Sequence, residues 1–175
     1  MKKFASCVAF IIFLGLITGC GNNENTRDLN TNLSTEIELS TEGASAVCTI
    51  DTDMNTNNRF VMGAKFVIFT EADIVTKVNV VEMAESNDSR TLREVRRELE
   101  ERYERASQYG GYTYDIRLEN NRLTISVTVD HTEVDFRQMA NDDQSLLLHL
   151  NEDFRFTLQT IIQMYESIGV RCNRL

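Results

Sequence analysis

The fold is decided by residues 112–130, which have the sequence YTYDIRLENNRLTISVTVD. Apolar and polar side chains alternate on both sides of Asn120 and Asn121. Asparagine tolerates a positive φ, so this pair suits a two-residue type I′ turn that places Leu118 opposite Leu123. The pattern therefore predicts a β-hairpin with one apolar and one polar face, which is typical of an antiparallel sheet.

Further strands are predicted on either side of this hairpin. Residues 60–69 form an apolar strand, residues 70–73 a turn, and residues 74–83 a returning strand. Residues 47–50 have the composition of a short strand, and residues 170–172 allow a last one. Leaving that last one aside, the chain is expected to form a sheet of about five strands, which is a common size.

Two amphipathic helices are predicted in the same region. Residues 89–107 and 152–168 each carry apolar side chains at helical spacing, and Gly169 follows the second as a helix-ending residue. The order β-β-β-α-β-β-α predicts an α+β domain, in which both helices pack on one face of the antiparallel sheet. Residues 132–150 are ambiguous, because Leu146–Leu150 suits either a helical turn or a buried segment.

Composition excludes several classes of protein. The chain has 175 residues, 18 Lys and Arg against 27 Asp and Glu, a net charge of −9, and no proline. So acidic a chain would be repelled by a phosphate backbone, which argues against a nucleic-acid partner. The length suits one folded domain, and the absence of proline excludes collagen-like and proline-rich chains.

The first twenty residues have the features of an export signal. Lys2 and Lys3 precede an uncharged apolar run over residues 4–17, which is too short to span a membrane. The run ends in Ile17-Thr18-Gly19-Cys20, which resembles the bacterial lipobox. Residues 1–19 are therefore expected to be a removable signal peptide, and Cys20 to carry acyl chains such as palmitate. An uncleaved anchor and an ordinary signal peptide are the alternatives.

The next segment is expected to be a tether. Residues 20–45 are rich in Asn, Thr, Glu and Ser, with isolated aliphatic residues. Such a composition is typical of a flexible coil, because it buries too little apolar surface to offset the entropy of ordering. A short helix or strand within residues 35–39 is the alternative. The folded extracytoplasmic domain is then expected to cover residues 46–175, held at the cell membrane or the outer membrane.

Two cysteines remain in the expected mature domain, Cys48 and Cys172. They lie at the two ends of the domain and outside the cytoplasm, where disulfides form. The sequence therefore predicts a Cys48–Cys172 disulfide. A zinc site is the alternative, but the spacing lacks the paired pattern of structural zinc sites; its ligands would be Cys48, His131, His149 and Cys172.

The remaining polar motifs do not predict a catalytic site. Residues 51–55 begin like a calcium loop, but Thr56 and Met62 stand where that loop needs Gly and Glu. His131 and His149 have no nucleophile motif beside them and are expected to be ordinary surface or half-buried residues. Asp135 is expected to cap a short turn. No catalytic residue, metal or cofactor is therefore predicted.

Several stretches resemble the YehR-like family of small bacterial lipoproteins of unknown function. They are the lipobox at Cys20, Cys48-Thr49, and residues 109–114, 128–135 and 165–172. The resemblance implies an extracytoplasmic α+β domain and carries no known activity. The function expected is therefore that of a lipid-anchored cell-envelope protein, attached to the membrane through Cys20, with a non-catalytic domain that binds a protein or small molecule. An envelope hydrolase or metal-dependent enzyme is the alternative.

Overall fold

The central hairpin forms as its sequence predicts. In the computed structural model, which describes residues 29–54 and 60–175, strand β4 (Tyr112–Glu119) pairs antiparallel with β5 (Arg122–Asp130). Leu118 faces Leu123 across the pair. Asn120 and Asn121 have φ values of 48° and 65°, as a type I′ turn requires.

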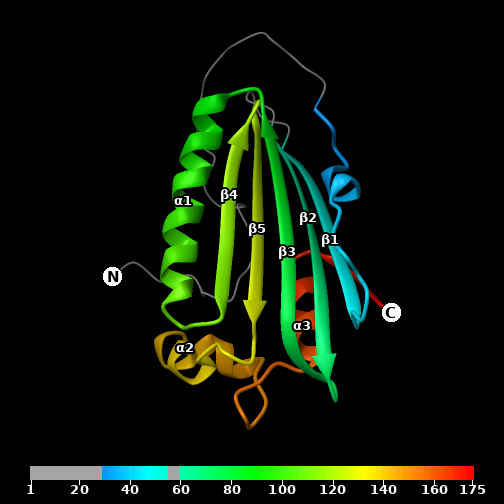
Figure 1. The fold of residues 1–175 in the computed structure, drawn as a ribbon, viewed down its shortest axis with the longest axis vertical. Coiled ribbons are helices and arrows are strands. Elements are labelled where there is room, and N and C mark those ends of the chain that lie inside the picture. The colour runs from blue at the N-terminus through cyan, green and yellow to red at the C-terminus, as the bar shows by residue number, and fades with distance from the viewer. Residues whose placement is uncertain (1–28, 55–59) are drawn as a thin grey trace.

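Six strands make up one antiparallel sheet, in the order β4-β5-β3-β2-β1-β6 (Figure 1). The other four are β1 (Ala46–Met54), β2 (Phe60–Glu71), β3 (Ile74–Ser86) and β6 (Arg171–Arg174). Strand β3 joins the two predicted hairpins, because it pairs with β2 on one side and with β5 on the other. The fold class is therefore α+β, and the optional last strand is present as β6.

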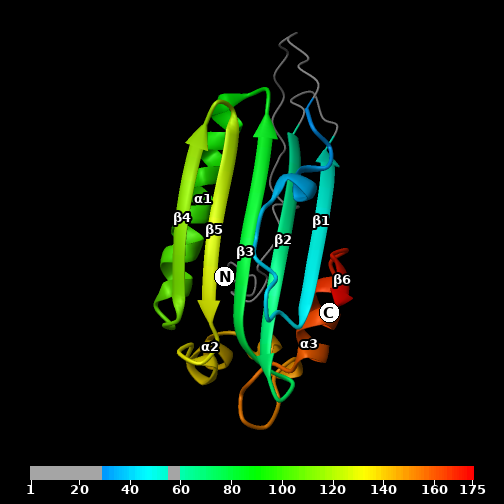
Figure 2. The same cartoon turned by 45° about the vertical axis from the view of Figure 1, so that its right-hand side comes forward.

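The α-helices cover one face of the sheet and lie at one end of it, whereas one short 3-10 helix lies on the other face (Figure 2). They are α1 (Ser89–Ser107), α2 (Phe136–Asp142) and α3 (Leu158–Glu166), with short 3-10 helices η1 (Leu33–Glu36) and η2 (Gln144–Leu148). Figure 2 shows α1 behind the strands and η1 in front of them. Asp135 caps α2 by accepting a hydrogen bond from the Gln138 amide, as expected.

The last helix is shorter than predicted, and a third helix was not predicted. The sequence indicated a helix over residues 152–168, but residues 152–157 form a loop in which Phe154 has a φ of 59°. Asn151 organises this loop, because its side chain accepts hydrogen bonds from the amides of Asp153 and Arg155. Helix α3 then begins after Thr157, which forms a capping box with Thr160.

The core lies between the sheet and the helices. The predicted apolar stripe of α1 is buried from Leu92 to Ala106, and from α3 the ring of Tyr165 lies 4.9 Å from that of Phe66 on β2. Strand residues that alternate toward this side, such as Val80 and Val127, are also buried. Both helices therefore pack on the same face, as predicted.

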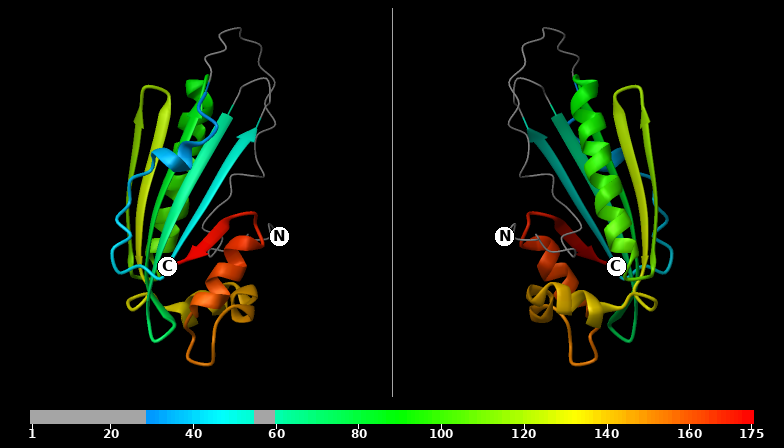
Figure 3. Two further views of the ribbon diagram at one scale, coloured as in Figure 1. Left: turned by 90° about the vertical axis from the view of Figure 1, so that its right-hand side faces the viewer. Right: turned by 90° about the vertical axis from the view of Figure 1, so that its left-hand side faces the viewer.

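The expected flexible tether is wrong for residues 29–37, whereas residues 38–45 form no helix or strand. Leu29, Leu33 and Ile37 are buried, and Leu29 and Leu33 pack with Val61 on the face of the sheet that the helices leave open. The two views of Figure 3 show η1 and α1 on opposite sides of the strands. Leu29 and Leu33 thus form a second, smaller core with Val61. The expected signal peptide and Cys20 lie outside the described residues.

Candidate functional site

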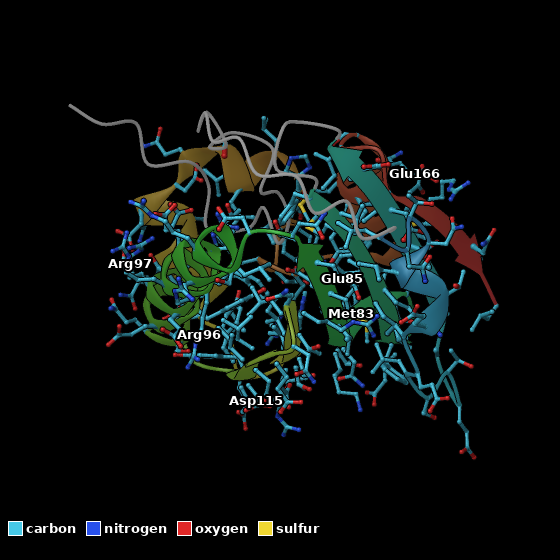
Figure 4. The ribbon with its side chains drawn as sticks, turned by 90° about the horizontal axis from the view of Figure 1, so that it is seen from above. Met83, Glu85, Arg96, Arg97, Asp115 and Glu166 are labelled. Carbon is cyan, nitrogen blue, oxygen red and sulfur yellow. A yellow bond between two sulfur atoms is a disulfide. The ribbon has the colours of Figure 1, made fainter. Side chains whose placement is uncertain are left out.

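A groove of about 630 Å³ lies where β3 ends and the β4–β5 turn begins. It is on the same side of the sheet as residues 29–37, which will be called the N-terminal strap. Figure 4 shows Met83 and Glu85 projecting from β3 toward the strap. A volume of this size falls within the range of small-molecule sites. The lining residues are Leu29, Asn30, Glu85, Ser86, Asn87, Arg117, Glu119, Asn120, Asn121, Arg122 and Thr124.

Arg122 ties the strap to the sheet at this groove. One guanidinium nitrogen lies 2.8 Å from a carboxylate oxygen of Glu36 in η1. Two others lie 2.7 and 2.5 Å from a carboxylate oxygen of Glu85 in β3. Asn30 also donates a hydrogen bond to Glu36. The lining residues Arg122 and Glu85 are therefore held in place by an ion-pair network that reaches Glu36 of the strap, behind the groove.

Close backbone packing holds the strap in place. The Ser34 amide donates a 2.8 Å hydrogen bond to the Asp51 carboxylate, and the Ser34 hydroxyl bonds the other oxygen of Asp51. Lys65 donates to the backbone carbonyl of Ile37 at 3.3 Å. Gly63 leaves room for the strap, because a Cβ at that position would lie 2.4 Å from the Ser34 amide nitrogen.

The groove has the chemistry of a site for an uncharged polar ligand. Its two arginines are balanced by two glutamates, and Arg122 is already paired with Glu36 and Glu85. Four asparagines contribute amide groups to the lining, and each amide both donates and accepts hydrogen bonds. The sequence alone identified no ligand site. The signals for this one were the polar face of the hairpin and its Asn120-Asn121 turn.

The predicted disulfide is present. Cys48 of β1 and Cys172 of β6 are direct partners in the strand register, with their Cα atoms 4.0 Å apart and their sulfurs bonded. The bridge fixes the short last strand to the edge of the sheet. Both cysteines of the alternative zinc site are used in this bridge, and within residues 29–54 and 60–175 no group of three or more possible ligands is brought together.

His131 is fully buried, which corrects the expectation of a surface or half-buried position. Only 4% of it is exposed, and its ring lies 5.0 Å from the ring of Phe136 and 5.7 Å from that of Phe156. Within the described part of the chain, its Nδ1 has no hydrogen-bond partner. Burial, assisted by the charge of Arg155, lowers the pKa of His131 to about 4. The imidazole is therefore a neutral core side chain at physiological pH. His149 is half-buried elsewhere.

Two of the stretches noted for their family resemblance pack against each other beside His131. The Asp130 amide donates to the carbonyl of Gly111, and the Asp135 amide donates to the carbonyl of Tyr109, both at 2.8 Å. A Cβ at Gly111 would lie 2.4 Å from the Asp130 carbonyl oxygen. These residues therefore form a tight structural corner between β5 and α2.

Glu82 is another buried ionisable group. It lies on the helix-covered face of β3, between Ala64 of β2 and Ile125 of β5, and is 5% exposed. Burial raises the pKa of Glu82 to about 7, against an opposing effect of the Arg102 guanidinium. The carboxyl is therefore poised to change charge near neutral pH, and its charge helps to raise the pKa of Tyr103.

No group of three or more His, Cys, Asp or Glu side chains in residues 29–54 and 60–175 is arranged to hold a metal ion. None of the helices formed by these residues is long and apolar enough to cross a membrane.

Comparison with known proteins adds a weak structural match. No family model and no curated protein matches the chain. A solved structure described as "NMR structure of the protein from Streptococcus pneumoniae TIGR4" aligns over 89% of this chain and 100% of its own, with 10% sequence identity and a TM-score of 0.38.

Proposed function

We propose that this protein is a lipid-anchored, extracytoplasmic binding protein of the bacterial cell envelope. The observation that carries the proposed location is the Cys48–Cys172 disulfide. A structural disulfide is typical of proteins that fold outside the reducing cytoplasm. It agrees with the lipobox-like Ile17-Thr18-Gly19-Cys20, which provides the proposed attachment point. The resemblance to YehR-like lipoproteins points in the same direction.

The test of the anchor is metabolic labelling with an alkyne analogue of palmitate. The natural chain should incorporate the label, and Cys20→Ala should not. Cys7→Ala is the matched control, because that cysteine lies within the proposed signal peptide and its loss should leave labelling intact. Unchanged labelling of Cys20→Ala, or an unlabelled natural chain, would exclude lipidation at this position.

The binding role is proposed for the groove beside Arg122. Its balanced charges disfavour strongly anionic or cationic ligands, whereas its asparagine amides suit the hydroxyl groups of a neutral sugar. We therefore propose that the ligand is a neutral, hydroxyl-rich molecule such as a sugar unit. No catalytic step is assigned to the site.

A panel of neutral mono- and disaccharides tests this role, with binding to the full chain measured by ligand-observed NMR. Asn87→Ala removes one lining amide and should weaken binding about tenfold, the size expected for one lost hydrogen bond. Gln163→Ala removes an exposed amide from α3 and should have no effect. Equal binding by both variants, or no binding of any sugar, would exclude the groove as a sugar site.

A further inference from the structure

Strand β4 is a long, regular strand at the open edge of the sheet. Its eight residues pair with β5 in an unbroken register, and no described strand pairs with its other side. Figure 4 shows no ribbon beyond β4 on the side of Asp115. Edge strands are usually protected by shortness, proline, a bulge or charged side chains. The opposite edge, β6, has four residues, whereas β4 has eight residues, no proline and no bulge, and its charged side chains Asp115, Arg117 and Glu119 all lie on one face.

The hairpin geometry determines which backbone groups of β4 face the open edge. A two-residue turn makes Glu119 and Arg122 a hydrogen-bonded pair, and hydrogen-bonded and non-bonded pairs then alternate along the strands. The backbone groups of Leu118, Ile116 and Tyr114 therefore point away from β5. These groups offer donors and acceptors to another strand at that edge.

A second copy of β4 fits this edge in one register better than in others. Antiparallel pairing centred on Ile116 brings outward-pointing backbone groups together and sets Tyr114 opposite Leu118 of the other copy. This register uses nearly the whole length of the strand. Centring the pair on Tyr114 or Leu118 shortens it. Centring it on Arg117 or Asp115 would also join outward-pointing backbone groups, but it would set two guanidinium groups, or two carboxylates, directly against each other.

The side chains in this register are complementary in charge. Asp115 of one copy lies opposite Arg117 of the other, and the two-fold axis produces this contact twice. Both positions belong to non-hydrogen-bonded pairs, in which the Cα atoms approach to about 4.5 Å. The two side chains are 55% and 69% exposed, and within one chain they already lie 2.6 Å apart. They can therefore exchange partners between copies without uncovering a charge.

The apolar face of β4 has a matching feature. Tyr114 is 38% exposed, and among the strands of the described residues it is the one large apolar side chain that is exposed. In the register centred on Ile116 it meets the half-buried Leu118 of the second copy. We propose that the protein forms a homodimer by antiparallel pairing of two β4 strands centred on Ile116, which continues the sheet across both copies.

The symmetry of this dimer agrees with a lipid anchor. The two-fold axis runs perpendicular to the sheet, so both N-terminal straps lie on the same side of the dimer. Both chains would then leave toward one bilayer. Only this agreement rests on the function proposed above, because the pairing itself depends on β4 alone.

Charge reversal at the two complementary positions tests the dimer. The full chain, produced in bacteria and extracted in mild detergent, is analysed by native mass spectrometry over a dilution series. The natural chain should have twice the monomer mass. Asp115→Arg and Arg117→Asp should each weaken dimerisation at least tenfold, because each creates two repulsive contacts. The double variant Asp115→Arg/Arg117→Asp should restore the dimer. All of these side chains are exposed, so folding should be unaffected.

Three outcomes would overturn the proposal. A monomeric natural chain would leave the edge free for a strand of another protein. Dimers of the natural chain, of both single variants and of the double variant would mean that the two copies associate through a surface other than β4. Loss of the dimer in the double variant as well would show that the register is wrong. None of these outcomes bears on palmitate labelling, so the dimer and the lipid anchor can fail independently.

Discussion

Gly63 of β2 lies directly beneath Leu33 of η1, so that a Cβ added at Gly63 would stand 2.6 Å from the Cβ of Leu33. The strap can pack on the sheet because this position has no side chain. The contact joins two segments far apart in the sequence, and it belongs to the small core that Leu33 forms with Val61. The strap, and with it one wall of the groove, therefore depends on a glycine in the middle of a strand.

Gly63→Ala should displace the strap. The added methyl group would overlap Ser34 and Leu33, and such overpacking costs about 1–3 kcal/mol. Urea unfolding of the full chain measures this loss. A glutamate-specific protease should also cut at Glu36 or Glu38 faster than in the natural chain, because the strap is no longer held down.

The control for this prediction is to introduce Gly63→Ala into a Leu33→Asp variant and compare its cost with that in the natural chain. Leu33→Asp detaches the strap by placing a charge in the small core, so adding Gly63→Ala to it should cost much less than in the natural chain. Additive losses would mean that Gly63 acts through strand β2 itself and not through the strap.

The hairpin was predictable and the strap was not, for a physical reason. The turn at Asn120-Asn121 and the alternation around it are local, so they fix the register of β4 and β5 without knowledge of the rest. The strap has only three apolar residues, Leu29, Leu33 and Ile37, and every residue between them is polar, so the segment has too narrow an apolar stripe to predict burial. They are buried only because Val61 and Gly63, which lie far along the chain, form a surface that receives them.

The same contrast applies to the candidate sites. The disulfide was predictable, because two cysteines remained in the expected mature domain and its two ends were expected to meet. His131 was expected to be at the surface or half-buried, whereas the rings of Phe136 and Phe156, which come from separate segments of the chain, pack against it. The groove was missed because its lining residues Asn30, Glu85 and Arg122 converge from three segments that are far apart in the sequence.

Removing the disulfide should destabilise the domain strongly. The bridge closes a loop with a sequence separation of 124 residues. In the chain-entropy model, such a loop contributes about 4–5 kcal/mol, as an upper value. The double variant Cys48→Ala/Cys172→Ala should therefore unfold at a much lower urea concentration than the natural chain, and added reductant should then have no effect on it. A midpoint equal to that of the oxidised natural chain would contradict this.

Glu82→Gln should stabilise the protein at alkaline pH. Burial raises the pKa of Glu82 to about 7 in the folded state, from its ordinary value of 4.5. The stability that its protonated form contributes is therefore present below 4.5 and is lost as the pH rises through 7. The full loss is roughly 3 kcal/mol. Gln mimics the protonated acid, so the variant should exceed the natural chain at about pH 8 and match it at about pH 4.

Glu85→Gln is the control for this pH dependence. Glu85 neighbours Glu82 in β3 but lies on the opposite face, where it pairs with Arg122. Its removal should not reproduce the alkaline gain. If Glu82→Gln and the natural chain lose stability in parallel between about pH 5 and 8, the buried carboxyl does not govern that range.

His131→Phe should reduce the sensitivity of the fold to acid. Burial lowers the pKa of His131 from 6.5 to about 4, so the neutral ring contributes stability that is present above 6.5 and is lost as the pH falls through 4. The loss is roughly 3 kcal/mol. A phenyl ring fits among Phe136 and Phe156 and needs no proton, so urea unfolding between about pH 7 and 4 should show a shallower decline. His149→Gln, outside this aromatic cluster, should keep the natural slope. Equal slopes in all three chains would assign the acid sensitivity to the carboxylates, whose protonation otherwise dominates acid unfolding.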